Sequence, residues 1–251
     1  MAEEMPFDLM VRFGPVPPRG AGHQDIESVR QALGRYRIYG AALASNRAIQ
    51  YDPISGNQQT AEAARQSQAI PVIVPGAVLD PRAFVGEAPT TPEGTRIYYI
   101  LPATQGYALP YAPLRALLNS LPRNLPLYFE ARREGDATQI GIVLREVGYA
   151  GAPVFLGGCT GSALNEAISV AKSLDFVGLT THGMRGVGEV QHAVKIVGAN
   201  RVLFASGSPS ESLSAAMALV KLAGLPPEER AAVFGNNARR LLGIAAPAAG
   251  A

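Results

Sequence analysis

The sequence predicts a (β/α)8 barrel, and three observations support this fold class. Eight short apolar segments of strand length alternate along the chain with amphipathic helical patterns. The segments are apolar on both faces, which is typical of parallel strands that helices cover. Eight such repeats in 251 residues suit a closed barrel better than an open sheet.

The predicted strands recur along the whole chain. Each is a short apolar run bounded by turn residues, as expected for a buried strand. The segments are residues 7–13, 41–45, 72–79, 97–101, 126–131, 153–158, 175–181 and 201–206. Because single helices separate them, the sequence favours a parallel sheet.

The predicted helices carry apolar residues three or four positions apart. They comprise residues 25–36, 112–121, 138–147, 162–174 and 188–198, and two more after the last strand at 210–224 and 226–243. Two sections are less regular. Residues 46–70 predict a polar loop followed by a helix, and residues 80–95 predict a weak, interrupted helix, so irregular helices are expected after strands two and three.

Three turns carry small or polar residues where a helix is expected to begin. We expect Ser162 to cap the helix after "GGCTGS", and Ser208 or Ser210 to cap the helix after "GSPSES". Such turns also bind phosphate, and barrels often hold it after strands seven and eight, so Ser206 and Ser208 are candidate anion ligands. In "YDPISGN", Asp52 and Asn57 are expected as turn or capping residues of a loop.

Composition excludes several classes of partner and cofactor. The net charge is +2 and the basic runs are only pairs, so neither nucleic acid nor an anionic membrane is expected as a partner. The longest apolar stretch, residues 69–79, is too short and too interrupted by Pro and Gly to span a bilayer, and we expect a cytoplasmic protein. A single cysteine and three histidines leave little material for a zinc site.

Chemistry in such a barrel is expected at the carboxyl ends of the strands. The residues there give a polar, mildly basic rim. They are Met10 and Arg12, Ser45 and Asn46, Glu130, Arg132 and Arg133, Gly158, Cys159 and Thr160, Thr181 and His182, and Ser206, Gly207 and Ser208.

Several of these stretches resemble the motifs of a known family. "NRVLFASGSPSES" and "EERAAVFGNNARRLLGI" resemble the closing motifs of the amidohydrolase-related family, whose members are TIM-barrel metal-dependent hydrolases and decarboxylases. "FDLMVRFG", "PGAVLDPR", "NLPLYFEARREG", "PVFLGGCTG" and "KSLDFVGLTTHG" resemble its other motifs in the same order. The resemblance covers nearly the whole chain. It implies a single TIM-barrel domain over residues 1–245, followed by a flexible tail at 246–251.

The resemblance also implies that the family's metal ligands are absent. Active relatives bind a divalent metal through histidines and an aspartate, and the positions that match these ligands here are Met10, Arg12, Glu130, Cys159 and Gly207. The Met10 thioether and Gly207 supply almost no ligand atom for a metal, and the Arg12 guanidinium repels a cation. We therefore expect no catalytic metal and no other cofactor.

Two alternatives remain for the charged residues of the rim. Arg12 and Arg132 could bind a small anionic ligand, or Arg12 and Glu130 could form an ion pair in the space of the metal. Cys159 and His182 could form a nucleophilic pair, but no acid is expected to orient the histidine, and a buried thiol is the commoner arrangement.

The sequence is compatible with two functions. In the first, the chain is a noncatalytic binder, regulator or partner subunit that has kept the barrel and lost the metal. In the second, it is a metal-independent hydrolase or lyase for a small carboxylated substrate, with Arg12 or Arg132 as anion clamp and Glu130 as general acid and base. The resemblance implies a homodimer or an association with an active relative.

Overall fold

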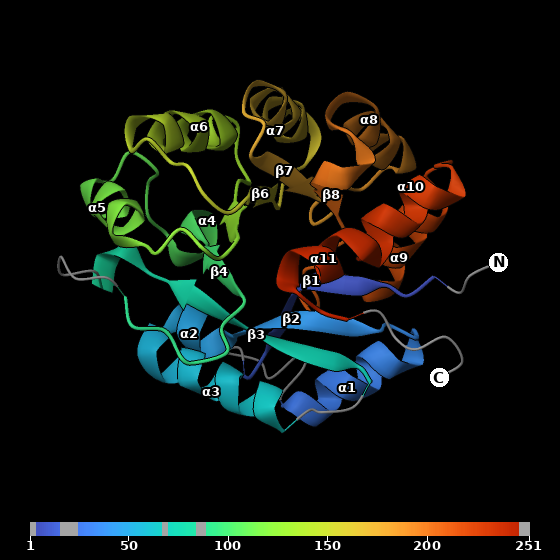
Figure 1. Ribbon diagram of the computed structural model, residues 1–251, viewed down its shortest axis with the longest axis horizontal. Helices are drawn as coiled ribbons and strands as arrows, with labels where there is room; N and C mark the ends of the chain where they lie inside the picture. The colour runs from blue at the N-terminus through green and yellow to red at the C-terminus, as the bar shows by residue number, and fades with distance from the viewer. Residues whose placement is uncertain (1–3, 16–24, 67–69, 84–88, 246–251) are drawn as a thin grey trace.

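Eight parallel strands form a barrel in the computed structural model, and helices surround it (Figure 1). The structure describes residues 4–15, 25–66, 70–83 and 89–245. The strands pair in chain order, β1 to β8. Their bounds are β1 (Phe7–Phe13), β2 (Gly40–Ser45), β3 (Val72–Leu79), β4 (Ile97–Ile100), β5 (Leu127–Glu130), β6 (Val154–Gly157), β7 (Val177–Thr180) and β8 (Val202–Leu203). The predicted (β/α)8 TIM barrel is confirmed, and every predicted strand is present.

The barrel closes between β8 and β1 through backbone hydrogen bonds. The Leu9 N–H donates to the Phe204 carbonyl at 3.0 Å, and the Arg12 N–H donates to the Ser208 carbonyl at 2.8 Å. Both acceptors lie beyond the two residues of β8 itself. The extended segment after β8 therefore stays attached to β1 as far as the carboxyl end of the barrel.

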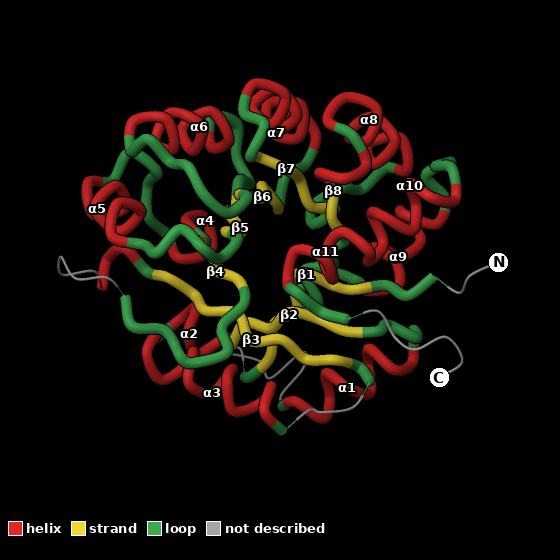
Figure 2. The backbone as a smooth tube through the Cα atoms, in the orientation of Figure 1, coloured by secondary structure: helices red, strands yellow, loops and turns green. Residues whose placement is uncertain are grey.

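Helices form the outer ring, and Figure 2 shows them around the strands. Their bounds are α1 (Ile26–Arg35), α2 (Asn46–Gln50), α3 (Pro53–Arg65), α4 (Pro102–Gln105), α5 (Ala112–Ser120), α6 (Asp136–Glu146), α7 (Gly161–Ser173), α8 (Val187–Val197), α9 (Leu213–Lys221), α10 (Pro227–Ala231) and α11 (Asn237–Leu242). Short 3-10 turns lie at Pro81–Ala83 and Ala199–Arg201, and a π-helical turn, Ala232–Asn236, joins α10 to α11. The helices predicted from apolar spacing are all present.

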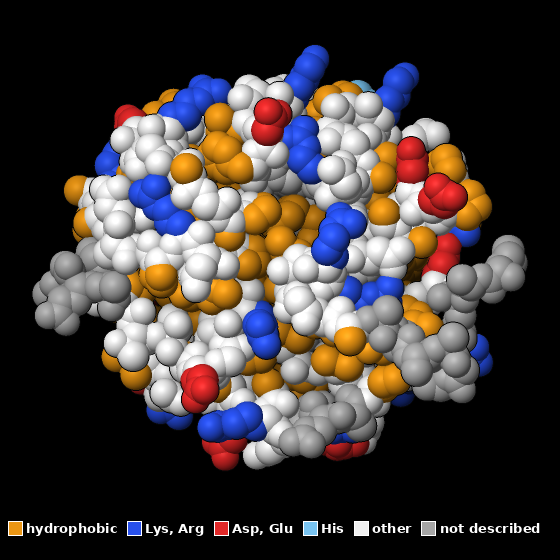
Figure 3. All heavy atoms as spheres, in the orientation of Figure 1, with side chains coloured by type: hydrophobic (Ala, Val, Ile, Leu, Met, Phe, Trp, Pro, Cys, Tyr) orange, Lys and Arg blue, Asp and Glu red, His pale blue; other side chains and the backbone are white. Residues whose placement is uncertain are grey.

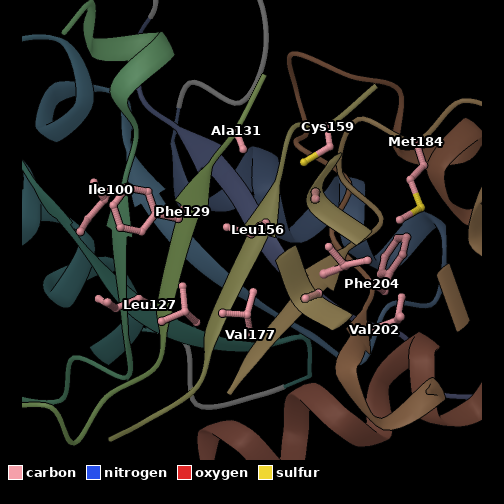
Figure 4. Packing of buried hydrophobic residues seen from close by; sticks show 14 of the residues in the cluster. Ile100, Leu127, Phe129, Ala131, Leu156, Cys159, Val177, Met184, Val202 and Phe204 are labelled. Atoms are coloured by element: carbon pink, nitrogen blue, oxygen red, sulfur yellow. The ribbon is translucent and has the colours of Figure 1, made fainter. Parts of the chain in front are cut away.

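Buried apolar side chains form two layers, one on each side of the strands. Inside the barrel, Leu9, Tyr99 and Tyr128 pack with residues of α2 and α11, so the barrel is filled. Outside it, a larger cluster joins the strands to the helices; Figure 4 shows part of this cluster, with Phe129 and Leu156. The alternation of the two layers along each strand follows from the pleat, since successive side chains point to opposite faces.

The segment after β2 differs from the predicted polar loop. Helix α2 begins at Asn46, directly after the strand, so residues 46–50 are helical. Asp52 caps α3 by accepting the Ile54 N–H at 3.0 Å, as predicted. Asn57 is not a turn residue, because it lies inside α3 and its amide bonds both the N–H and the carbonyl of Val78. This contact spans 21 positions in the chain, and a local pattern does not show it.

Two of the predicted helix caps are wrong. Thr160 is the N-cap residue of α7, and the Ser162 hydroxyl instead donates to the Glu134 carboxylate. Ser212, rather than Ser208 or Ser210, caps α9 by accepting the Ala215 N–H at 3.4 Å. α7 nevertheless begins within the predicted turn, at Gly161, whereas α9 begins later than predicted, at Leu213.

The described surface carries charges of both signs. On the face shown in Figure 3, basic and acidic side chains are interspersed around apolar ones. Among the described residues, no helix combines the length and the apolar character needed to cross a membrane. The predicted tail, residues 246–251, lies outside the described residues.

Candidate functional site at the barrel mouth

The carboxyl ends of the strands bring charged side chains together at one end of the barrel. Glu130 ends β5, Arg132 follows it closely, and Arg12 lies near the end of β1. His182 follows β7, and Glu211 lies on the turn between β8 and α9. Ion-pair or hydrogen-bond contacts connect Arg12, Arg132 and Glu130, and connect His182 to Glu211. These five residues are called the mouth cluster below.

Glu130 is the most firmly held residue of the mouth cluster. Its Oε1 accepts from the Thr104 hydroxyl and from Arg132 Nε, and its Oε2 accepts the Thr104 N–H, each at 2.7 Å. Burial alone would raise the pKa of Glu130, but the Thr104 hydrogen bonds and the charges of Arg132 and Arg12 outweigh it and hold the pKa below its ordinary value. Glu130 is therefore an ionised carboxylate whose oxygens are already engaged.

Arg12 is buried beside Glu130 but makes no hydrogen bond to it. Its Nη2 lies 3.8 Å from Glu130 Oε1, so the predicted ion pair is present. Its Nε and Nη2 atoms are buried and have no hydrogen-bond partner among the residues that the structure describes. Each such N–H group costs about 1–3 kcal/mol when it is left unpaired in the interior. The two groups lie along one edge of the guanidinium, the edge that binds a carboxylate through two parallel hydrogen bonds.

His182 lies between Tyr128 and Glu211, and both of its ring nitrogens are engaged. The Tyr128 hydroxyl contacts Nδ1, and Nε2 lies 3.5 Å from Glu211 Oε1. A neutral ring that carries its proton on Nε2 satisfies both contacts. Burial lowers the pKa of His182, and the hydrogen bond to Glu211 opposes this shift only in part. The expectation that no acid lies beside His182 is wrong.

The His182 ring also occupies the space beside Gly207. A Cβ atom at position 207 would lie 2.5 Å from both Cδ2 and Nε2 of the ring. The backbone there has φ of +70°, a conformation that favours glycine. An acidic side chain at position 207 would therefore require His182 to move.

A second buried acid, Asp8, lies beneath the mouth and was not among the predicted site residues. Its carboxylate accepts the Ser206 hydroxyl, the Ser206 N–H at 2.9 Å and the Met10 N–H at 3.1 Å. Burial raises the pKa of Asp8 to about 6, although these hydrogen bonds oppose the shift. The sequence carries a signal for it, because an acid near the start of a largely apolar strand needs buried partners.

The two serines proposed as anion ligands are held by the protein itself. The Ser206 hydroxyl donates to Asp8 and accepts the Ser208 N–H at 3.0 Å. The Ser208 carbonyl accepts the Arg12 N–H. Both serines are buried. Their polar groups thus join β8 to β1, which gives them a structural role at this turn.

Cys159 does not pair with His182. It lies in the outer apolar layer, in the cluster that contains Ala131 and Met184 (Figure 4). Burial raises the pKa of the Cys159 thiol to about 12, so the thiolate form that a nucleophile needs is disfavoured. Since both nitrogens of His182 face other partners, the structure does not bring the two candidate residues into a dyad.

The residues matched to metal ligands do not fit a divalent metal. Met10 is buried in the inner layer, Cys159 lies in the outer layer, and Gly207 has no side chain. Arg12 brings a positive charge to the centre of the mouth, so Glu130 is the one carboxylate at these positions. No group of three His, Cys, Asp or Glu side chains in the described part of the chain could hold a metal ion.

A family model described as amidohydrolase matches residues 142–244. This match covers β6 to α11, which includes the last part of the rim. No curated protein matches the sequence. The resemblance to the amidohydrolase family, first seen in the order of the motifs, is confirmed by the family model.

Solved structures share the fold at low sequence identity. A 5-carboxyvanillate decarboxylase from Novosphingobium aromaticivorans, complexed with manganese and a nitrobenzoic acid, aligns with a TM-score of 0.69 and 12% identity over 96% of each chain. A 2,6-dihydroxybenzoate decarboxylase from Rhizobium gives 0.62 and 15%, over 96% of this chain and 99% of that one. An amidohydrolase 2 from Bifidobacterium longum gives 0.66 and 14%, over 97% and 100%.

Proposed function

We propose that this chain is a noncatalytic member of the amidohydrolase family, whose model matches residues 142–244, and that it binds a small carboxylated molecule at the mouth of the barrel. The observation that carries this proposal is the buried edge of Arg12, whose Nε and Nη2 have no acceptor in the described part of the chain. A carboxylate matches that edge in charge and in geometry. Arg132 and Glu211 are partly exposed, so part of the mouth cluster faces solvent.

The noncatalytic role is supported by how the candidate catalytic groups are held. Glu130 already accepts three hydrogen bonds, and Nδ1 of His182 is engaged by the buried Tyr128 hydroxyl. A general acid or base needs a lone pair or a proton that faces the substrate. A metal-independent hydrolase or lyase would have to break one of these arrangements first.

The rest of the mouth also supports a binding role. The donor set among the described residues offers no metal site, so the Lewis-acid chemistry that a bound metal would supply has no ligands there. In the decarboxylase from Novosphingobium, a carboxylated aromatic compound is bound together with manganese. We propose that this chain keeps the recognition of a carboxylate and lacks the metal-dependent step.

Isothermal titration calorimetry with benzoate, isophthalate and the neutral isostere benzamide tests the proposal. The wild-type protein is expected to bind the two carboxylates and not benzamide. Arg12→Met is expected to weaken carboxylate binding by more than about tenfold, because one bidentate charged pair is worth more than about 1.4 kcal/mol. Arg115→Met removes an exposed arginine that pairs with Glu146, and it is expected to leave binding unchanged.

Three results would contradict the proposal. They are the absence of carboxylate binding, equal affinity in the wild-type and Arg12→Met proteins, and the release of a chemically altered carboxylate during prolonged incubation. The last result would favour the enzymatic alternative.

A further inference from the structure

The turn that carries Glu211 is joined to the strand that carries Arg12. The Gly207 N–H donates to the Met10 carbonyl at 3.1 Å, and the Arg12 N–H donates to the Ser208 carbonyl at 2.8 Å. The Glu211 N–H in turn donates to the Gly207 carbonyl at 3.3 Å. The backbone therefore holds the Glu211 side chain beside the same mouth that contains the buried edge of Arg12.

The two carboxylates of the mouth cluster are held very differently. Glu130 accepts three hydrogen bonds of 2.7 Å and has no exposed side-chain surface. Within the described residues, the Glu211 carboxylate has one long polar contact, 3.5 Å from His182 Nε2, and 34% of its side chain is exposed. A carboxylate held by one long contact at a solvent boundary exchanges partners far more readily than one held by three short ones.

Glu211 also lies within the electrostatic reach of the cations around the mouth. Its charge acts on Arg12, and the charges of Arg132 and Arg185 act on Glu211. An incoming carboxylate would meet the same cations. Two carboxylates that share one small set of cations repel each other, and the less firmly held one is displaced.

We propose that Glu211 is a built-in competitor, a carboxylate of the chain itself that shares the cations of the mouth and must withdraw when a carboxylated ligand binds at Arg12. This inference rests on the proposed function and adds its regulation. Glu211 thus controls access to the site, and we expect a bound carboxylate to break the long contact between Glu211 and His182. Any change that draws the 207–212 turn away from the mouth would then raise affinity.

Titration of isophthalate into Glu211→Gln tests the inference. The substitution keeps the shape of the side chain and removes its charge, so affinity is expected to rise by about fivefold or more, the usual lower limit of coupling between two sites. Glu62→Gln is the matched control, because Glu62 is exposed on α3 and the substitution changes the net charge by the same amount. It is expected to leave the affinity unchanged.

A second variant and a second measurement guard against a purely structural effect. Glu211→Ala, checked for folding by circular dichroism, is expected to raise affinity in the same direction. In the wild-type protein, isophthalate is expected to shift the 15N resonance of His182 Nε2 toward its position in Glu211→Ala, because ligand and substitution both remove the contact between Nε2 and the Glu211 carboxylate.

The outcomes separate this inference from the proposed function. Tighter binding by both Glu211 variants than by the wild-type protein, with no change in Glu62→Gln, supports the inference. Equal or weaker binding by the Glu211 variants overturns the inference alone. An absence of carboxylate binding in every protein overturns the inference and the proposed function together.

Discussion

The two halves of the barrel mouth hold their polar side chains in opposite ways. Over β2 and β3, polar side chains bond the backbone: the Asn46 amide donates to the Gly14 carbonyl at 2.7 Å, and the Asn57 amide bonds Val78. Apolar Ile49 and Leu101 fill the space beside them. Over β5, β7 and β1, the charged side chains of the mouth cluster contact one another, and two nitrogens of Arg12 have no acceptor among the described residues.

This difference shows where a ligand can add stability. In the first half, the Asn46 and Asn57 amides already bond backbone groups. A ligand would therefore add no hydrogen bond to them that the chain does not already supply. In the second half a ligand carboxylate would satisfy buried N–H groups that now have none. Polar residues at a barrel rim therefore mark a site only where their hydrogen-bonding capacity is not used by the fold.

The largest effect on stability is expected at Gly207, which packs against the His182 ring. Gly207→Ala is expected to lower the free energy of unfolding by more than about 4 kcal/mol, since the new Cβ meets the His182 ring and the backbone φ is positive. Gly106→Ala is the control, because Gly106 has φ of +75° and open space around it. Its expected cost, measured by urea unfolding, is about 1 kcal/mol. Equal costs at the two positions would show that His182 does not fill the space beside Gly207.

A smaller loss is expected when Glu130 is removed. Glu130→Ala leaves Arg12 and Arg132 without their acid, and breaking a buried ion pair costs about 3–5 kcal/mol. Glu146→Ala, which breaks the exposed pair with Arg115, is expected to cost less than about 1 kcal/mol. Similar losses in the two variants, measured by urea unfolding at neutral pH, would contradict the buried pairing at the mouth.

The contribution of Asp8 to stability is expected to fall as the pH rises, whereas that of an ordinary paired carboxylate rises. The pKa of Asp8 is about 6 in the folded chain, whereas the ordinary value for an aspartate is 3.8, so between these values the folded state binds more protons than the unfolded state. Stability from Asp8 is therefore full below pH 3.8 and is lost as the pH rises to about 6, by about 3 kcal/mol in total.

The variant Asp8→Asn isolates this effect. His182, whose pKa is lowered, acts in the other direction as the pH falls, and it is present in both proteins. The difference in unfolding free energy between Asp8→Asn and wild type is expected to move in favour of the variant as the pH rises from about 4 to about 7. A difference that stays constant over this range would show that Asp8 does not titrate near pH 6 in the folded chain.

The fold could be predicted from the sequence because its signals are local. Each strand is a contiguous apolar run, and the spacing between runs leaves room for one helix. The ion pair of Arg12 and Glu130 could also be predicted as one alternative, since both residues lie at strand ends that a barrel brings together. The role of Asn57 could not be predicted, because this residue lies on helix α3 and both of its hydrogen-bond partners are backbone groups of Val78 on β3.

The remainder of the site depends on distances that no local pattern contains. Glu211 could be seen only as a residue near a helix start, and its contact with His182 joins two loops of the closed barrel. Cys159 was matched to a metal-ligand position by its place after a strand, but its side chain packs in the outer layer. At such a turn, one residue more or less decides whether a side chain faces the mouth or the helices.

We propose that the mouth of this barrel binds a carboxylate and does not hold a divalent metal. The most direct test is elemental analysis of the protein after incubation with Zn²⁺ or Mn²⁺ and removal of free metal by gel filtration. We expect far less than one metal ion per chain, and the same content in the wild-type and Glu130→Gln proteins. One tightly held metal ion per chain that is lost in Glu130→Gln would contradict the claim.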